Sequence, residues 1–532
     1  MTDHQREAGA EAAERRSSDV ERRYLAARDV IMELQQVLLP TALPVLPAVS
    51  VAARYLVAAR DQAAGGDWFD AVALEDGRLA LVVGDVVGHG VAASATMGQL
   101  RAVLDVALVE TGDLEESLAQ ADRMATRTPA LRAATVCAGV LDPATGVLQY
   151  STCGHPPPLL IAADGSTRYL AATGGAPLGT GSRPTTATEQ IDPGDVLLLY
   201  SDGLIERPGE PLDAGLATLA QVAGEAATDG AAPTGAPTPV VDRVAQRSME
   251  LLTRTGYDDD VTVLAVQRRA TPVEALRHEL PAEPRGVSAA RATVRRWLAP
   301  LGPGPEDLRA IEMAVTELVS NAVQHAYPSG QPGVVRVHAE LGTDGMLNVA
   351  VGDDGRWCAP GAAPADVGGR GLWIAGKVID DLTIDHGQPD APDAPRERLG
   401  TTVVTLRHRM HHPAVLASEP APLEPRSPAV EFSAAFEDGP PRTLRVSGSV
   451  DITNVAELAA NLEIASRGGV HPLVVDLTET YVLGSAGVRA LFGARDQHAI
   501  HGQRMTIVAP PASLAAQVLD MVGLDHVPAA PE

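Results

Sequence analysis

Residues 82–90 read VVGDVVGHG, an apolar run that carries an aspartate at its end and glycines after it. In three of five such motifs, an Asp lies at one end of a Val/Leu-rich run, with Gly or another Asp close to it in sequence. Strand ends of this kind send carboxylates into a shared cleft, where glycine lets the backbone come close. The other four motifs lie between residues 49 and 268: GGDWFD (65–70), CGHPPP (153–158), LYSDGLIE (199–206) and YDDDVTVLAV (257–266).

Converging carboxylates repel one another unless cations lie between them. Oxygen ligands without His/Cys clusters suit Mg²⁺ or Mn²⁺ rather than Zn²⁺. A site with two such metals can activate a water for in-line attack on phosphorus. Each motif alone is weak evidence, because Asp-Gly is typical of a turn and His89 and His155 fit ordinary loop histidines. The ordered set of motifs is therefore what indicates a metal site.

This ordered set resembles the metal-dependent PPM-type serine/threonine phosphatases, specifically the bacterial SpoIIE/RsbU branch. Residues 34–70, which lead into the motif GGDWFD and include it, are also similar to that branch. The resemblance implies a β-sandwich flanked by helices, with Mn²⁺ or Mg²⁺ in a two-metal site. It makes Asp85 the bridging, catalytic ligand, assisted by the carbonyl of Val86. Asp258 and Asp260 stay open as substitutes for the last ligand. The carboxylate ligands it assigns are Asp67, Asp85, Asp202 and Asp259.

A second set of motifs begins with the amphipathic stretch AIEMAVTELVSNAVQHAY (310–327). Glu317 and Asn321 are four residues apart, so both lie on one face of the helix. Such a pair taken alone is also typical of a solvent-exposed helix face. An amide oxygen can ligate Mg²⁺ on phosphates, a buried Asp can accept from an adenine amino group, and glycine-rich backbone can cradle phosphate at a helix start. The motifs that follow are LNVAVGDDGRW (347–357), GGRGLWIAG (368–376) and LGTTVVTL (399–406).

Residues 272–410 therefore resemble the GHKL ATPases, an α/β sandwich, and among them the anti-sigma-factor serine kinases. The resemblance implies ATP with Mg²⁺, Glu317 as general base, Asn321 as Mg²⁺ ligand and Asp353 as adenine reader. Two departures, Trp357 and the insertion at 388–395, leave open whether the domain turns ATP over or only binds it. The further nucleotide-binding positions that it implies are Gly355, Gly369, Gly371 and Thr401.

Residues 429–528 resemble a STAS domain of the anti-sigma-factor antagonist type, through VSGSVDITNVAELAANL (446–462) and VVDLTETYVLGSAGVRALF (474–492). The resemblance makes Ser485 the phosphoacceptor, at a helix start where free N–H groups and the helix dipole favour phosphate. Ser485 also fits a plain helix cap, and the two roles are compatible. Gly484 and Ala486 stand where the family has Asp and a second Ser or Thr.

The length and net charge of the chain limit the number of domains and the kinds of partner that we expect. A chain of 532 residues predicts three or four domains. With 42 Lys+Arg against 68 Asp+Glu, the net charge of −26 argues against binding nucleic acid or an anionic membrane. No run reaches the ~18–20 apolar residues that span a bilayer, the polar N-terminus is no signal peptide, and three cysteines form no disulfide framework. We expect a cytoplasmic, multidomain α/β protein.

The expected organisation begins with a helix that Pro40 ends. Its apolar seam from Val20 to Leu38 is heptad-like and fits two alternatives, packing on the next domain or a parallel homodimer through residues 20–38. The expected segments are a disordered 1–17, a linker helix 18–48, the phosphatase region 49–268, the ATPase region 272–410, a Pro-rich linker 411–428 and the STAS region 429–528.

Together the three resemblances predict a partner-switching regulator of a sigma factor. Its metal-dependent serine phosphatase would dephosphorylate a STAS antagonist, either its own Ser485 or a separate protein. Its ATP-binding domain would act as serine kinase and anti-sigma factor, with sigma factor and STAS antagonists as partners. The alternative is an active phosphatase whose kinase-like and STAS modules only bind such partners.

Overall fold

The computed structural model describes residues 37–57, 65–88, 90–181, 183–206, 211–228, 238–254, 257, 259–327, 332–355, 370–386, 399–417, 432–437, 439, 441–511 and 513–529. Most of the heptad seam, the insertion at 388–395, His89, Asp258, Trp357 and Gly369 lie outside these residues. The chain forms two compact units, which we describe separately: Met1–Pro272 with His411–Glu424, and Val273–Met410 with Pro425–Glu532. Within the described ranges, none of the helices combines the length and apolar character that crossing a bilayer requires.

The two larger β-sheets among the described residues of the first unit have the strand orders β18-β2-β11-β10-β7-β8 and β3-β4-β5-β6-β9. All five residues of β10 are buried, as expected for a strand covered on both faces. The strands of the first sheet are β2 (Val49–Leu56), β7 (Leu159–Ile161), β8 (Thr167–Tyr169), β10 (Val196–Tyr200), β11 (Val261–Arg268) and β18 (Val415–Ala417). Those of the second are β3 (Trp68–Ala73), β4 (Leu79–Asp85), β5 (Thr135–Leu141), β6 (Val147–Ser151) and β9 (Ala187–Gln190).

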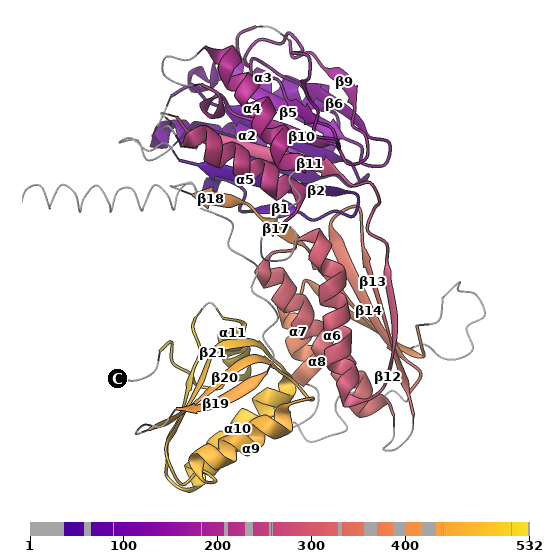
Figure 1. The fold of residues 1–532 in the computed structure, drawn as a ribbon, viewed down its shortest axis with the longest axis vertical. Helices are drawn as coiled ribbons and strands as arrows, with labels where there is room; N and C mark the ends of the chain where they lie inside the picture. The colour runs from indigo at the N-terminus through magenta and orange to yellow at the C-terminus, as the bar shows by residue number, and fades with distance from the viewer. Residues whose placement is uncertain are drawn as a thin grey trace, which may run out of the picture. The chain divides into compact units, whose positions relative to one another are not determined.

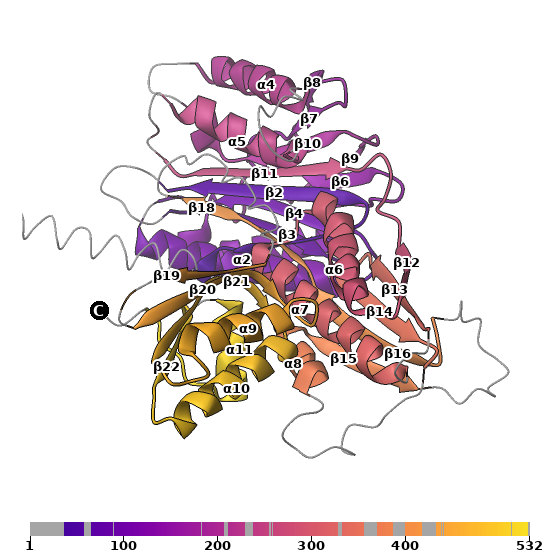
Figure 2. The ribbon, with the colours of Figure 1, turned by 60° about the horizontal axis from the view of Figure 1, so that its bottom comes forward.

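Helices cover these sheets. The helices α4 (Leu212–Thr228) and α5 (Val240–Thr253) lie side by side over the sheet that contains β10 and β11 (Figure 2). The second sheet packs against α2 (Val91–Thr111), and α3 (Leu114–Arg127) packs against α2. Asp113 caps α3 by accepting a hydrogen bond from the Glu116 N–H, which explains why the helix begins there. The predicted sandwich flanked by helices is confirmed.

Part of the segment that the sequence assigns to a Pro-rich linker is ordered into strands. The strand β17 (His411–Pro413) pairs with β1 (Ala42–Pro44), and β18 adds in parallel to the edge of β2. The His412 Nε2 atom lies 3.2 Å from Asp242 Oδ1 on α5, which anchors the segment further. An edge strand has free N–H and C=O groups to offer, so even a segment of three residues can be recruited to it.

The second unit begins with an antiparallel sheet in the order β12-β13-β14-β16-β15, packed against α6, α7 and α8 (Figure 1). The helix α7 is buried on every side from Ile311 to Ser320, and at Asn321 it passes into a π turn, η4 (Ala322–Ala326), a rare feature that often marks functional sites. The elements are β12 (Leu276–Pro281), α6 (Pro284–Leu298), α7 (Pro305–Asn321), β13 (Val334–Leu341), β14 (Met346–Asp353), α8 (Arg370–Val378), β15 (Asp381–His386) and β16 (Thr402–Arg409).

The same unit ends in a four-stranded sheet, in the order β19-β20-β21-β22. The last three strands are parallel and β19 is antiparallel to β20. The hydrophobic core of this part also includes Met313 of α7 and Ile374 of α8, so the two parts of the unit share apolar packing. The elements are β19 (Ser433–Glu437), β20 (Arg442–Val450), α9 (Val455–Ser466), β21 (Leu473–Leu483), α10 (Ser485–Ile500), β22 (Met505–Val508) and α11 (Leu514–Val522).

Candidate functional sites

The first unit gathers the aspartates that the sequence singles out. Asp85 ends β4, and Asp202 follows β10 in a single helical turn. Burial and the charges of Asp85 and Asp260 raise the pKa of Asp67 well above its usual range. Burial and the charges of Asp202 and Asp259 raise the pKa of Asp85 to about 7. These mutual effects show that the structure brings the predicted carboxylates into one acidic cluster.

Two glycines make this close approach possible. A Cβ atom at Gly66 would lie 2.1 Å from the carbonyl oxygen of Val86 and 2.9 Å from Asp85 Oδ1. The Val86 N–H donates to the Gly66 carbonyl over 3.2 Å, which holds the two loops together. At Gly203 a Cβ would lie 2.1 Å from the Asp260 carbonyl oxygen. The predicted carbonyl ligand, Val86, therefore lies beside the predicted bridging carboxylate.

The two candidate aspartates before β11 differ in environment. Asp260 is buried, and its Oδ2 accepts a hydrogen bond of 2.8 Å from the Tyr55 hydroxyl. Asp259 is exposed and accepts from the Asp260 N–H over 2.8 Å. The Thr262 hydroxyl donates to Asp67 Oδ2 over 3.0 Å. Tyr55 and Thr262 were not foreseen, because nothing in a strand sequence reveals which side chain faces an acid from another strand.

His155 is a buried histidine between β5 and the end of β10. Its Nε2 lies 3.1 Å from the carbonyl oxygen of Tyr200, so Nε2 carries the proton. Its Nδ1, 2.8 Å away, then accepts from the Thr135 hydroxyl. Burial lowers the pKa of His155 to about 4, which keeps the ring neutral. His155 thus connects the strand that leads to Asp202 with Thr135, the β5 partner of Asp85.

The donor set of the cluster fits hard divalent cations, because it consists of carboxylates and a carbonyl that repel one another without a counter-charge. In the part of the chain that the structure describes, no three His, Cys, Asp or Glu side chains already form a group that could hold a metal ion. Burial, and after it the charges of the neighbouring carboxylates, raise the pKa values of Asp67 and Asp85.

The predicted nucleotide-site residues of the second unit lie at the ends of their elements. Asp353 ends β14, burial raises its pKa, and its Oδ1 accepts from the Gly355 N–H over 2.9 Å. The N–H of Thr401 donates to the Asp353 carbonyl over 2.8 Å, which connects two predicted positions far apart in sequence. Asn321 is the last residue of α7, one turn beyond Glu317.

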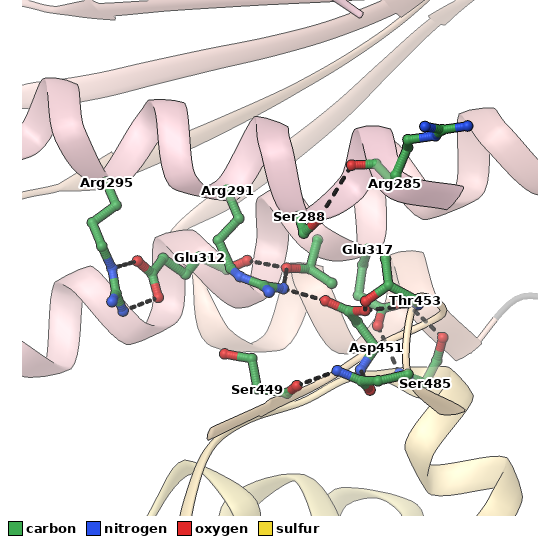
Figure 3. A network of polar contacts seen from close by, with 12 residues as sticks. Arg285, Ser288, Arg291, Arg295, Glu312, Glu317, Ser449, Asp451, Thr453 and Ser485 are labelled. Carbon is green, nitrogen blue, oxygen red and sulfur yellow. Dashed lines mark hydrogen bonds and ion pairs between the residues drawn. The ribbon is translucent and has the colours of Figure 1, made fainter. Parts of the chain in front are cut away.

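The candidate base and the candidate phosphoacceptor are in direct contact (Figure 3). The Ser485 hydroxyl donates to Glu317 Oε2 over 2.7 Å, and the Ser485 N–H donates to Glu317 Oε1 over 2.7 Å. The Glu317 side chain is buried, and burial raises its pKa although the two Ser485 hydrogen bonds oppose that shift. A Cβ at Gly371 would lie 2.2 Å from Glu317 Oε2, so this glycine leaves the space that the contact needs.

A second polar contact, unforeseen from the sequence, joins the same two parts of the unit. The Arg291 guanidinium forms an ion pair with Asp451, whose side chain is fully buried, and also donates to the Thr316 hydroxyl over 3.3 Å (Figure 3). One helical turn later, Arg295 pairs with the buried Glu312 and lies 4.8 Å from the ring centre of Tyr481. The four-residue spacing of the two arginines could have indicated this contact from the sequence, because it places both side chains on one face of α6.

Three family models match the chain, in the predicted order. They are Stage II sporulation protein E (SpoIIE) over residues 75–269, the histidine kinase-like ATPase domain over 280–402, and the Mlab, STAS domain over 434–529. The crystal structure of the RsbU and RsbW domains of Rv1364c from Mycobacterium tuberculosis is 41% identical, with a TM-score of 0.62, and the match covers 72% of this chain and 98% of that one.

Curated relatives match shorter parts. Protein IcfG of Synechocystis is 31% identical over 206 residues, 33% of this chain and 32% of its own. Serine-protein kinase RsbW of Bacillus velezensis is 35% identical over 86 residues, 16% of this chain and 53% of its own, and several anti-sigma F factors match as well. The chain thus spans about a third to a half of the length of these two relatives. It belongs to the family of proteins that join an RsbU-type SpoIIE phosphatase domain to an RsbW-type histidine kinase-like ATPase domain, and it carries a STAS domain after them, which together make a partner-switching architecture.

Proposed function

We propose that the ATPase domain is a serine kinase that phosphorylates Ser485 of the same chain, and that the phosphatase domain removes this phosphate. The observation that carries the proposal is the 2.7 Å hydrogen bond from the Ser485 hydroxyl to Glu317. A nucleophile and a base at this distance have the geometry of general base catalysis. The name of the related Serine-protein kinase RsbW supports the same reaction.

In the kinase step, Glu317 takes the proton of the Ser485 hydroxyl while Oγ forms a bond to the γ-phosphorus of ATP and the bond to ADP breaks. Burial strengthens Glu317 as a base, because its raised pKa makes the carboxylate a better proton acceptor than an exposed glutamate. Asp353 would accept a hydrogen bond from the adenine amino group, and the backbone at Gly371 and Thr401 would lie beside the nucleotide. Asn321 would hold the Mg²⁺ that accompanies ATP.

In the phosphatase step, Asp67, Asp85, Asp202 and Asp259 would hold Mn²⁺ or Mg²⁺ with help from the Val86 carbonyl. The metals would neutralise the acidic cluster and supply Lewis-acid activation of a water molecule. Tyr55 and Thr262 keep the surrounding carboxylates in place through their hydrogen bonds to Asp260 and Asp67. The products are the free hydroxyl of the serine and inorganic phosphate.

The partners that we propose are a sigma factor and STAS antagonists, because anti-sigma F factors are among the relatives of the ATPase domain. Phosphate on Ser485 adds about −1.5 to −2 charge beside Glu317 and so disfavours the docked state. Release of the STAS domain would then expose the face of α6 and α7 to another partner. Dimerisation through residues 20–38 stays a prediction.

The test is incubation of the full chain with γ-labelled ATP. Wild type should incorporate label, Ser485→Ala should lose it, and Glu317→Gln should label at least about 100-fold more slowly. Adding Mn²⁺ should then release the label from wild type but not from Asp85→Ala. Equal labelling of wild type and Glu317→Gln would refute Glu317 as the base, whereas no labelling of wild type would refute the kinase and favour purely binding kinase-like and STAS modules.

A further inference from the structure

We propose that Tyr481 makes this ATPase domain prefer its own STAS domain, because the tyrosine ring packs on the Arg295 guanidinium across the two domains. The inference rests on the proposed function of Glu317 and Ser485 as base and phosphoacceptor, and it names a specificity-determining residue for that site. The partner class that it predicts is a STAS domain with an aromatic side chain four residues before its serine.

Arg295 is held in one orientation by its own domain. Its Nη2 atom donates to Glu312 Oε2 over 2.7 Å and its Nε atom donates to Oε1, so the two side chains meet as a fork (Figure 3). Glu312 lies on α7, and its side chain is fully buried. Because Glu312 occupies the edge of the planar guanidinium, a face of that plane is left for stacking.

Tyr481 reaches Arg295 from the STAS domain. The guanidinium carbon of Arg295 lies 4.8 Å from the centre of the tyrosine ring, within the ~6 Å range of a cation–π interaction. Tyr481 belongs to β21, which contacts α7, and its half-buried ring also packs against the core of the STAS domain. The contact therefore joins the two domains through residues other than Glu317 and Ser485.

The environment keeps both groups in the forms that attract each other. Burial lowers the pKa of Arg295, but the hydrogen bond and charge of Glu312 outweigh burial, so the pKa is raised overall. Burial, and after it the charge of Glu312, raises the pKa of Tyr481, although Arg295 and Arg309 oppose this shift. A cation therefore faces a neutral, electron-rich ring where water is partly excluded, which strengthens cation–π attraction.

The ring acts on docking and not on the fold of the ATPase domain. The pair of Arg295 with Glu312 lies entirely within that domain, so it does not need the STAS domain to form. A small side chain at position 481 would leave the face of Arg295 without the ring and so weaken docking. Similar partners are distinguished by such a difference in affinity.

The experiment uses four single variants of the full chain. Tyr481→Phe keeps the ring and removes the hydroxyl, whereas Tyr481→Leu keeps an apolar side chain and removes the ring. Arg295→Gln removes the cation but keeps an N–H donor for Glu312. The matched control is Arg495→Gln, because Arg495 lies 4.7 Å from the ring centre of Phe492 on the same helix, α10, and its side chain is 45% exposed.

Docking is measured without ATP by the hydrogen-exchange protection of the Ser485 amide, which donates to Glu317. The Val475 amide, on β21 between β20 and β22, reports the fold of the STAS domain itself. With ATP, the initial rate of Ser485 phosphorylation is measured for the same proteins. If wild type incorporates no phosphate, the kinase proposal fails, whereas the amide protection still decides the role of Tyr481.

We expect Tyr481→Leu and Arg295→Gln each to lower Ser485 protection and the phosphorylation rate about three- to thirtyfold. Tyr481→Phe and Arg495→Gln should stay within about twofold of wild type, and protection at Val475 should not change. The double variant of Tyr481→Leu with Arg295→Gln should lose little more, because each change already removes the same contact.

Four results would each overturn the proposal. They are wild-type protection of the Ser485 amide in Tyr481→Leu, an equal loss in Tyr481→Phe, an equal loss at Val475, and additive losses in the double variant. An equal loss in Tyr481→Phe would assign the effect to the hydroxyl, and an equal loss at Val475 would assign it to the fold of the STAS domain.

Discussion

Ser485 donates hydrogen bonds of 2.7 Å from both its hydroxyl and its backbone N–H to the two carboxylate oxygens of Glu317, across 168 residues of sequence. One carboxylate thus serves as a proton acceptor for the hydroxyl and as the cap of α10. The same contact can position a nucleophile and hold two domains together, so changes at this point should affect chemistry and docking in parallel.

The pH dependence of Ser485 phosphorylation should report Glu317. Burial raises the pKa of this carboxylate above its usual 4.5, and only its deprotonated form can act as base. The rate should therefore rise about tenfold per pH unit below the raised pKa and level off above it. Initial labelling rates measured against pH would show this limb. An inflection at or below pH 4.5 would contradict the assignment.

The Arg291–Asp451 pair should dominate docking of the STAS domain. Asp451 is fully buried, so Arg291→Met leaves an uncompensated buried charge and should cost about 3–5 kcal/mol. The exposed pair Arg495–Asp496 is the control, and Arg495→Met should cost less than about 1 kcal/mol. Calorimetric unfolding and Ser485 amide exchange would measure both. Similar costs for the two variants would contradict this role of the buried pair.

Asp85 should lower the unfolding free energy of the metal-free protein and should be required for stabilisation by bound metal. Its pKa of about 7 lies above the usual 3.8, so the folded state holds its proton more tightly and ionisation at neutral pH opposes folding. In EDTA, Asp85→Asn should raise the unfolding free energy of the phosphatase domain by roughly 1–3 kcal/mol.

With Mn²⁺, wild type should become more stable to unfolding than Asp85→Asn. Wild type should gain about 2.7 kcal/mol at a metal concentration 100 times the dissociation constant, and Asp85→Asn should gain little. Scanning calorimetry with EDTA and with Mn²⁺ provides both values. A full Mn²⁺-induced shift in Asp85→Asn would remove Asp85 from the ligand set.

His155 should make the phosphatase domain sensitive to mild acid. Its pKa is about 4 in the folded protein and 6.5 when unperturbed, so between these values the unfolded chain binds more protons. The stability that His155 contributes is present above pH 6.5 and is lost as pH falls toward 4, by at most about 3 kcal/mol.

His155→Gln cannot gain this proton and should lose less stability than wild type between about pH 7 and about pH 5. The exposed His471→Gln variant should follow wild type. Unfolding midpoints at the two pH values would compare the three proteins. A fall in His155→Gln as large as that in wild type would show that other groups cause the acid sensitivity.

Much of the fold could be predicted because its signals are local. The strand ends at Asp85 and Asp353, the helix that carries Glu317 and the helix start at Ser485 all read directly from apolar runs and glycine positions. The order of the three domains is confirmed. The two short strands β17 and β18 could not be predicted, because a segment of three residues becomes a strand only when a strand elsewhere in the chain accepts it as a partner.

The sequence by itself determined which chemical groups this protein has: an acidic set for hard cations, a glutamate and an asparagine on one helical face, and a serine at a helix start. Only the tertiary structure decided which of them meet. The contact of Ser485 with Glu317, the pairing of Arg291 with Asp451 and the support of Asp260 by Tyr55 join residues far apart in the chain. Such pairings depend on how whole domains pack, and local periodicity carries no record of them.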